Sequence, residues 1–392
     1  MKKIYNILLT ILVCGLMMGI RPASARDISI HGFISQGYLK TDQNNYLADT
    51  DKGSFQFNEM GLNFTTYVLK DLKVGMQFFA RDLGAVGNDE VTLNWAFAEY
   101  TFKNWLGLRA GLIKIPFGFY NDTRDFDSLR TSIFLPSGVY NEWQRDGLNS
   151  MKGAELFGAL DMAAGGVLEY QLQIGQSQIP LDSGSARFVT EVNGGFENLT
   201  RIDLGIGYIA RLIWTTPLDG LRLGASYLLA DNEWDATRVI SDTAKYPMTL
   251  DSTFTYIIGS MEYVFRNFTL AAEIYRQERD ADAYVTVPGV GVMTLDQDLL
   301  TKDIFYVRGG YRFTDWFEAG YYYSEYFGNK DSHLIKDELK DHCLSLRFDI
   351  NYNWIAKAEV HKMNGEFGVE ADDDGHKYSE WMLYALKISY SF

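Results

Sequence analysis

The stretch RIDLGIGYIARLIW, from Arg201 to Trp214, decides the fold of this chain. Apolar side chains occupy every second position, at Ile202, Leu204, Ile206, Tyr208, Ala210, Leu212 and Trp214. Charged and small residues share the other parity, at Arg201, Asp203, Gly205, Gly207 and Arg211. A period of two residues is that of a β-strand, because successive side chains point to opposite faces. The pattern therefore predicts one continuous strand over residues 201–214.

Two further stretches, 344–353 and 382–392, repeat this division. In each, one face is apolar and aromatic, while the other carries small residues and charges, with Asn also present in 344–353. A soluble sandwich also alternates, but its outer face is broadly polar. Lipid instead demands apolar side chains outside and aromatic girdles at both interfaces, while a barrel interior holds water. The alternation favours an all-β, transmembrane, antiparallel up-and-down β-barrel, whose closure leaves no exposed edge strand.

The composition agrees with a barrel and excludes several other classes. The 392 residues are 47% hydrophobic and 15% aromatic, with a mean hydropathy of -0.15 and a net charge of -15. A disordered chain would carry fewer aromatic residues, and a helical membrane protein would be more apolar. Two cysteines cannot form a disulfide framework, and an acidic chain is a poor partner for nucleic acid. We therefore expect no nucleic-acid partner.

The first 25 residues have the pattern of a signal peptide. Lys2 and Lys3 precede an apolar run over 7–20, and Ala23-Ser24-Ala25 forms a small-x-small cleavage site. The run is too short to span a bilayer. Cys14 lies within the run after Val13, where a lipoprotein leader needs a small residue. We expect residues 1–25 to be removed on export and residues 26–392 to form one outer-membrane barrel.

Sixteen segments after this leader fit the alternating pattern. Their connections alternate between very short turns, such as those near Asp71, Asn104 and Arg266, and long polar stretches. Short turns on one rim and long loops on the other are typical of outer-membrane barrels. The predicted strands are 27–40, 54–70, 72–81, 91–103, 106–115, 151–160, 166–176, 201–214, 221–230, 253–265, 267–278, 303–313, 316–327, 342–353, 354–363 and 378–392.

The C-terminal Tyr390-Ser391-Phe392 is similar to the insertion signal of Gram-negative barrels, and residues 26–392 resemble the sixteen-stranded outer-membrane porins. The segment GLIKIPFG at 111–118 is similar to the G-x-x-K-x-P-F-G pattern of the phosphate-selective porin O and P group. The resemblance implies a water-filled channel for passive diffusion of ions and small hydrophilic solutes. It also implies a homotrimer that contacts membrane lipid and lipopolysaccharide, and it implies no cofactor.

The longest connection, about 117–150, follows the fifth predicted strand. In porins the loop at this position folds into the barrel and narrows the channel, so the resemblance predicts a constriction loop here. Its candidate pore-lining residues are Asp122, Arg124, Asp125, Asp127, Arg130, Glu142 and Arg145. Strand parity adds wall cations at Arg109, Arg201, Arg211, Arg222, Arg308, Arg312, Arg347, Lys357 and Lys387. Acidic wall candidates are Glu99, Glu155, Glu169, Asp203, Glu262, Glu273, Glu318, Asp349 and Glu359.

Two interpretations of these charges stay open. They can pair across neighbouring strands and leave a mixed, weakly selective lumen. They can also form an arginine track that favours anions such as phosphate. Sequence cannot choose between them, because the alignment of charged rows on neighbouring strands is not visible in it.

Other functions find less support. An outer-membrane barrel hydrolase would need a Ser/His/Asn or Asp/His constellation at strand ends, and we find none, so we expect no catalysis. The acidic loops at 42–51 and 366–374 lack the spaced ligand pattern of a Ca²⁺ loop. The five histidines show no metal-ligand spacing, and Cys343 is expected to be a free thiol without a catalytic partner. We therefore predict no metal and no catalytic site.

Overall fold

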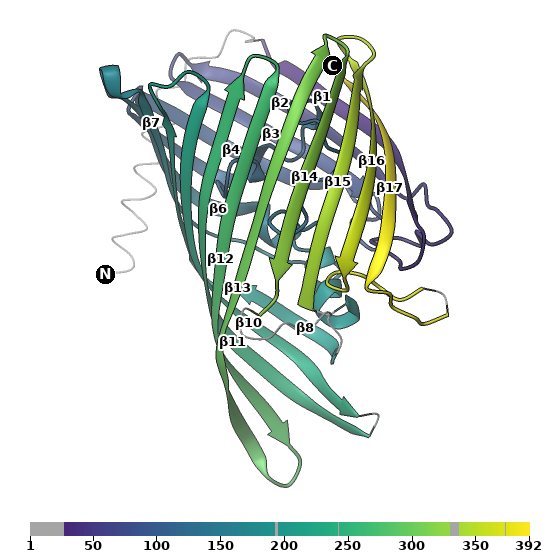
Figure 1. The fold of residues 1–392 in the computed structure, drawn as a ribbon. Coiled ribbons are helices and arrows are strands. Elements are labelled where there is room, and N and C mark those ends of the chain that lie inside the picture. Colours follow the sequence, from purple (N-terminus) through teal and green to yellow (C-terminus); the bar gives the residue numbers. More distant parts are fainter. Residues whose placement is uncertain (1–26, 193–194, 242, 330–336, 373) are drawn as a thin grey trace, which may run out of the picture.

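The computed structural model describes residues 27–192, 195–241, 243–329, 337–372 and 374–392. The predicted leader lies outside these residues. Within them, no helix is long and apolar enough to cross a membrane. Sixteen antiparallel strands pair in a ring, which closes where β1 (Ser29–Thr41) pairs with β17 (Glu380–Ser391) and with β2 (Asn58–Leu69). The chain is therefore a closed all-β barrel, as the alternation predicted (Figure 1).

The other strands follow one another around the ring in chain order, with β8 as the one exception. They are β3 (Leu72–Asp82), β4 (Thr92–Lys103), β5 (Leu106–Lys114), β6 (Ser150–Asp161), β7 (Val167–Gln176), β8 (Phe196–Leu204), β9 (Gly207–Thr215), β10 (Leu221–Ser241), β11 (Ala244–Phe265), β12 (Phe268–Val287), β13 (Gly291–Thr314), β14 (Phe317–Phe327), β15 (Glu338–Asp349) and β16 (Trp354–Gly365). Short helical turns interrupt the loops: η1 (Asn121–Thr123), η2 (Asp127–Leu129), η3 (Asp146–Leu148), η4 (Ala163–Gly165), α2 (Gly184–Arg187) and η5 (Phe188–Val192).

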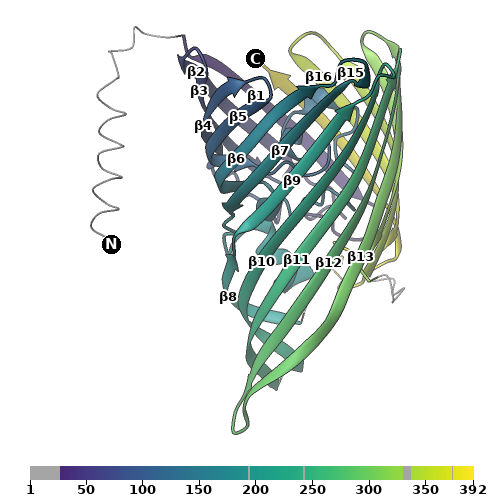
Figure 2. The ribbon, with the colours of Figure 1, turned by 90° about the vertical axis from the view of Figure 1, so that its left-hand side faces the viewer.

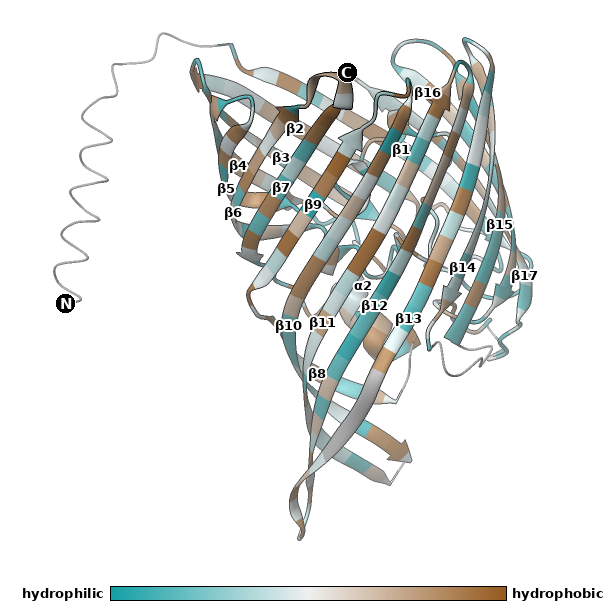
Figure 3. Cartoon of the chain, turned by 60° about the vertical axis from the view of Figure 1, so that its left-hand side comes forward, coloured by the Kyte–Doolittle hydropathy of each residue, from teal (hydrophilic) through white to brown (hydrophobic). Residues whose placement is uncertain are grey.

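The last strand shows how the alternation builds the wall. Tyr384, Leu386 and Ile388 point outward and are exposed, whereas Leu383 and Lys387 are at most 4% exposed on the inner face. Apolar and polar residues alternate in this way along the strands of the wall (Figure 3). An outward apolar surface of this kind is stable only against lipid, since water would leave it unfavourably hydrated.

Four strands extend far beyond the predicted bounds. β10, β11, β12 and β13 contain 21, 22, 20 and 24 residues, and their two hairpins project past the rim that carries the long loops (Figure 2). A small apolar cluster stabilises the projection, formed by Met248, Leu250, Ala281, Ala283 and Val285. Predicted segments 221–230, 253–265, 267–278 and 303–313 cover only the part of these strands nearer the short turns.

The continuous strand predicted over 201–214 is wrong, because Gly205 and Ile206 divide it into β8 and β9. β9 belongs to the barrel and pairs with β7 and β10. Among the strand ladders, β8 belongs only to the one it forms with the projecting part of β10. In that ladder Ile202 lies opposite Trp234. The predicted strand 342–353 is also too long, because residues 350–353 form the turn after β15.

Candidate functional site

The segment between β5 and β6, residues 115–149, lies inside the barrel. The backbone N–H groups of Ile133 and Phe134 donate to Glu359 on β16, at 2.7 and 3.1 Å. Tyr140 Oη donates to Glu273 on β12 at 2.6 Å. Because β12 and β16 are far around the ring from β5, the segment crosses the lumen. We call residues 115–149 the constriction loop.

Apolar packing fixes the loop in place. Trp143 is fully buried and donates its indole N–H to the carbonyl of Gly368 at 3.0 Å. Phe134 stacks on Phe57 of the entrance to β2, with ring centroids 5.3 Å apart. At the loop entrance, Gly118 has a φ of 59°, and a Cβ there would collide with the hydroxyl of Tyr140. Glycine is therefore suited to this inward turn, since it has no steric penalty at positive φ.

Acidic and basic side chains interlock where the loop leaves the wall. The carboxylate of Asp125 accepts from Lys114 at 2.7 Å and from Arg145 at 2.5 Å. Both of these cationic side chains are largely buried. Asn94 and Gln77 complete its shell at 2.6 and 3.0 Å. Burial alone would raise the pKa of Asp125, but Lys114 and Arg145 outweigh burial and hold it well below its ordinary value. Asp125 is therefore an ionised anchor.

Glu142 is a second anchor in the same region. It pairs with Arg124 at 2.7 Å, with Arg81 of β3 at 2.8 Å and with Arg145 at 3.3 Å. Burial would raise its pKa, yet these three guanidinium groups lower it. We call Asp125, Glu142, Lys114, Arg124 and Arg145 the loop-base network. Its charges pair with one another, which favours a structural role.

Asp127 ties the far side of the loop to β16 and β17. Its carboxylate accepts from Lys387 at 2.8 Å and from Ser389 at 2.6 Å, and its backbone carbonyl accepts from Lys357 at 2.7 Å. Arg130 pairs with the same carboxylate at 3.1 Å. Burial would raise the pKa of Asp127, but Lys387 and Lys357 lower it.

A cavity of about 320 Å³ lies between the constriction loop and the short-turn end of the wall. Four guanidinium groups and two carboxylates line it, so its charged lining has two positive charges in excess. These residues are Arg130, Arg308, Arg312, Arg347, Glu262 and Glu318. We call this space the arginine cavity.

Each wall arginine of this cavity is held in place. Arg308 donates to the hydroxyl of Tyr120 at 2.8 Å and lies over its ring, 4.3 Å from the centroid. Arg312 pairs with Glu318 at 3.0 Å and with Asp349 at 2.8 Å. Arg347 pairs with Asp349 at 2.8 Å and donates to the carbonyl of Ser128 on the loop, also at 2.8 Å. The guanidinium groups are thus positioned by the wall and by the loop.

A second cavity, of about 170 Å³, lies toward the long-loop rim. Most of its lining is apolar, including Phe188 and Leu228, but Arg279 and Lys302 also reach it. Lys302 Nζ lies 5.7 Å from the ring centre of Tyr326. Within the described residues, neither cation forms an ion pair, so positive charge lies on both sides of the loop.

Three further predicted pore residues, Arg109, Arg211 and Arg222, lie in the wall. Arg109 sits between Glu99 and Glu155, at 2.9 and 2.8 Å, and pairs across neighbouring strands. Arg211 of β9 binds Asp122 of the loop at 2.7 Å, and Arg222 of β10 binds Glu262 at 2.6 Å.

Arg201 requires a correction. Because parity changes at Gly205–Ile206, Ile202 and Leu204 line the smaller cavity, and Arg201 lies on the opposite face of β8. There it pairs with Asp235 at 2.7 Å and with Glu233, and its side chain is 40% exposed. Arg201 therefore does not face the lumen.

Several residues of the site were missed in the sequence. Glu59 and Arg81 face inward from β2 and β3 and bind Arg145 and Glu142 of the loop, each at 2.8 Å. Strand parity could have found both, since each lies on the buried face of its strand. Cys343 is a free thiol, and the contact of its sulfur with His361 Nε2, at 3.7 Å, was also missed in the sequence.

Known structures share this architecture. No protein-family model matches the chain, and no curated protein matches it by sequence. The fold is similar to that of OmpT of Vibrio cholerae, with a TM-score of 0.59 at 13% identity over 95% of this chain and all of that chain. The anion-selective porin of Comamonas acidovorans gives 0.58 at 12% identity, over 93% and 99% of the two chains. The DcaP channel of Acinetobacter baumannii gives 0.54 at 12% identity, over 95% and 99%. The chain thus has the fold of the sixteen-stranded outer-membrane porins.

Proposed function

We propose that this chain is an outer-membrane porin through which ions and small hydrophilic solutes diffuse passively. A sixteen-stranded barrel is wide enough to enclose an aqueous passage. The loop across the lumen, with a cavity on either side of it, supplies a constriction that limits solute size. The outward apolar side chains suit a lipid bilayer, since exposure to water would be unfavourable.

The arginine cavity favours anions over cations as the preferred ions. This single observation carries the proposal: Arg130, Arg308, Arg312 and Arg347 surround one space together with only two carboxylates. Rings of pore-lining charge raise the local concentration of the opposite ion. A porin described as anion-selective has a similar fold, which agrees with this preference. The phosphate-selective group suggested by residues 111–118 remains a prediction.

The proposal places the protein in the outer membrane as an exported homotrimer in contact with lipid and lipopolysaccharide. One similar structure, of in-vitro folded OmpT, is described as a trimer form. Diffusion through a channel needs no cofactor and no nucleic acid. The leader predicted at 1–25 would direct the export.

The competing function is hydrolysis. One cluster resembles a catalytic triad, because His361 lies between the thiol of Cys343 and the carboxylate of Asp341. In such a triad these residues would be the base, the nucleophile and the acid. Each is at most 1% exposed, so a substrate cannot reach the thiol in this conformation. The geometry therefore supports a channel better than an enzyme.

Planar-bilayer recording on the purified protein tests the proposal. We expect discrete conductance steps and, in a KCl gradient, a reversal potential of the sign set by anion preference. Conductance steps with a cation-selective reversal potential would support the porin function and refute the anion preference. Hydrolytic turnover of an ester or peptide substrate without conductance steps would overturn the porin itself.

A further inference from the structure

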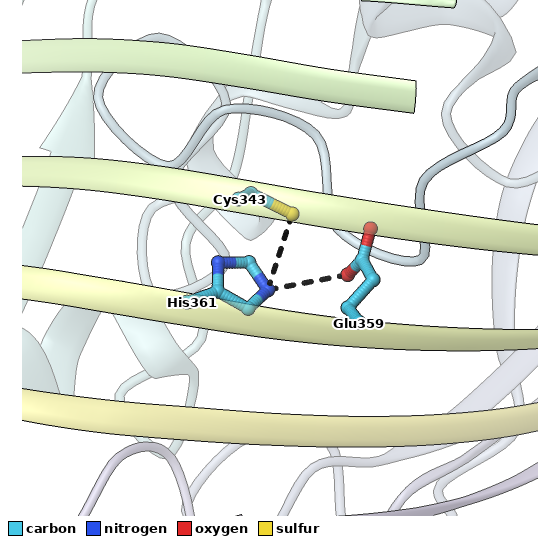
Figure 4. Close-up of side chains that lie close together, drawn as sticks. All are labelled: Cys343, Glu359 and His361. Atoms are coloured by element: carbon cyan, nitrogen blue, oxygen red, sulfur yellow. Dashed lines mark hydrogen bonds and ion pairs between the residues drawn. The ribbon is translucent and has the colours of Figure 1, made fainter. Parts of the chain in front are cut away.

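Three chemically reactive side chains meet in the wall beside the constriction loop: Cys343 of β15, and Glu359 and His361 of β16 (Figure 4). Each is at most 2% exposed. We propose that Cys343, Glu359 and His361 form a binding site for a transition-metal ion of the Zn²⁺ class.

The donor atoms have the spacing of ligands to one ion. His361 Nε2 lies 3.7 Å from Cys343 Sγ and 3.3 Å from Glu359 Oε2. In a tetrahedral zinc site, bonds of about 2.3 Å to sulfur and about 2.0 Å to nitrogen or oxygen place neighbouring donors roughly 3.3–3.6 Å apart. All three ligand atoms also lie within 4.8 Å of one another. An ion can therefore contact them with small side-chain adjustments.

The strand register explains why the three side chains meet. Cys343 lies directly opposite His361 in the β15–β16 ladder, and Glu359 lies opposite Ser345. Residues two apart on a strand share a face, so Glu359 and His361 both point inward. The ligands come from two strands, which is why no familiar spacing marks them in the sequence.

A further carboxylate orients the histidine. Asp341 Oδ1 lies 3.0 Å from His361 Nδ1, and Tyr322 Oη donates to Asp341 Oδ2 at 2.8 Å. When Nδ1–H donates to Asp341, the neutral ring presents the lone pair of Nε2 toward Cys343 and Glu359. Histidines that bind metals commonly donate their other ring nitrogen to a carboxylate in this way, which fixes the ring and strengthens the ligand.

The donor set selects the class of ion. A thiolate and an imidazole suit Zn²⁺ and Co²⁺, whereas Mg²⁺ and Ca²⁺ prefer sites made of oxygen alone. Ser345 Oγ lies 3.5 Å from Cys343 Sγ and is a candidate for a fourth ligand.

The site also touches the constriction loop. Glu359 Oε2, the oxygen nearest His361, accepts from the N–H of Phe134, whose ring lies edge-on to His361 at 6.3 Å. A metal that engages this oxygen would weaken the contact to Phe134. We expect metal binding to change channel conductance, and this consequence alone rests on the proposed porin function.

Folding the purified protein in detergent with Co²⁺, followed by desalting, tests the site. We expect one Co²⁺ per chain and a thiolate-to-cobalt absorption band in the near ultraviolet. Cys343→Ser should lose the band, and His361→Ala should weaken binding by about tenfold or more. His342→Ala is the matched control, because His342 is exposed and contacts Tyr321 instead, so binding should not change.

If Cys343→Ser binds as much Co²⁺ as the unmodified protein and gives the same absorption band, the proposed site is overturned. Circular dichroism checks that each variant folds. If a variant does not fold, the unmodified protein still decides, because no thiolate band at saturating Co²⁺ refutes the proposal. Conductance of the metal-free protein is recorded from the same preparation, so failure of the metal site and failure of the porin function are distinguishable.

Discussion

The loop-base network and the arginine cavity contain the same kinds of side chain in different arrangements. At the loop base, Asp125 and Glu142 lie between cations that bind them directly. In the arginine cavity, four arginines face a space with two carboxylates. Paired buried charges are satisfied by one another and hold backbone in place. The guanidinium groups of the arginine cavity are also paired, but they line open space and are therefore available to a passing ion. The two regions thus separate structure from selectivity.

The largest change should follow removal of the loop itself. Deleting residues 129–138 removes the contacts of Ile133 and Phe134 with Glu359. Because the lumen would widen, we expect single-channel conductance to rise roughly twofold. An unchanged conductance in a folded variant would show that this part of the loop lies outside the current path.

Breaking the loop base should loosen the loop without removing it. Asp125→Asn leaves Lys114 and Arg145 without their shared carboxylate, and removing one partner of a buried pair costs about 3–5 kcal/mol. Hydrogen exchange of the amides at 115–149 should report this loss. Asp303→Asn is the control, since its pair with Arg276 is 38–51% exposed and should contribute little to stability. Equal effects of the two changes would contradict the distinction.

Acid should release the same anchors, but only at low pH. Asp125, Asp127 and Glu142 have pKa values below their ordinary range, because the neighbouring cations outweigh the effect of burial. A depressed pKa stabilises the folded state above the unfolded pKa, and this stability is lost as pH falls through the folded pKa. Conductance should therefore stay constant from about pH 7 to about pH 4 and rise only below that. A transition near pH 6 would show that other groups control the loop.

The smallest change should come from neutralising the arginine cavity. Arg308→Gln, Arg312→Gln and Arg347→Gln together should move the reversal potential toward cation preference by roughly 10 mV in a tenfold KCl gradient. Arg201→Gln is the matched control, because Arg201 lies outside the lumen and should leave the potential unchanged. Arg201→Gln removes one charge and the triple variant removes three, so a shift about a third as large in Arg201→Gln would assign the effect to overall charge.

The barrel wall could be predicted from sequence because lipid enforces one rule on every strand. Residues 382–392 alternate as β17 does, and the sixteen barrel strands were counted correctly. The rule fails where lipid ends. On β10 the outward-facing positions change from apolar residues, at Leu223 and Tyr227, to acidic residues, at Asp231, Glu233 and Asp235, which marks the start of the projection. The interruption at Gly205–Ile206 falls in the same region.

The site was less predictable, because it depends on the path of one loop. The charged residues of 115–149 were identified, but their partners lie on strands from β2 to β17. Whether Asp125 meets Arg145 or an arginine of the arginine cavity depends on how Trp143 and Phe134 pack. Cys343 and His361 were missed for a different reason, because a cross-strand register brings them together.

A cysteine placed in the arginine cavity gives the most direct test that this space lies in the conduction path. Thr131 of the loop lines the cavity and donates to Glu318, so Thr131→Cys in a Cys343→Ser background offers one accessible thiol. A negatively charged sulfonate thiol reagent should lower the single-channel current and move the reversal potential toward cations. Complete labelling that leaves both quantities unchanged would contradict the account.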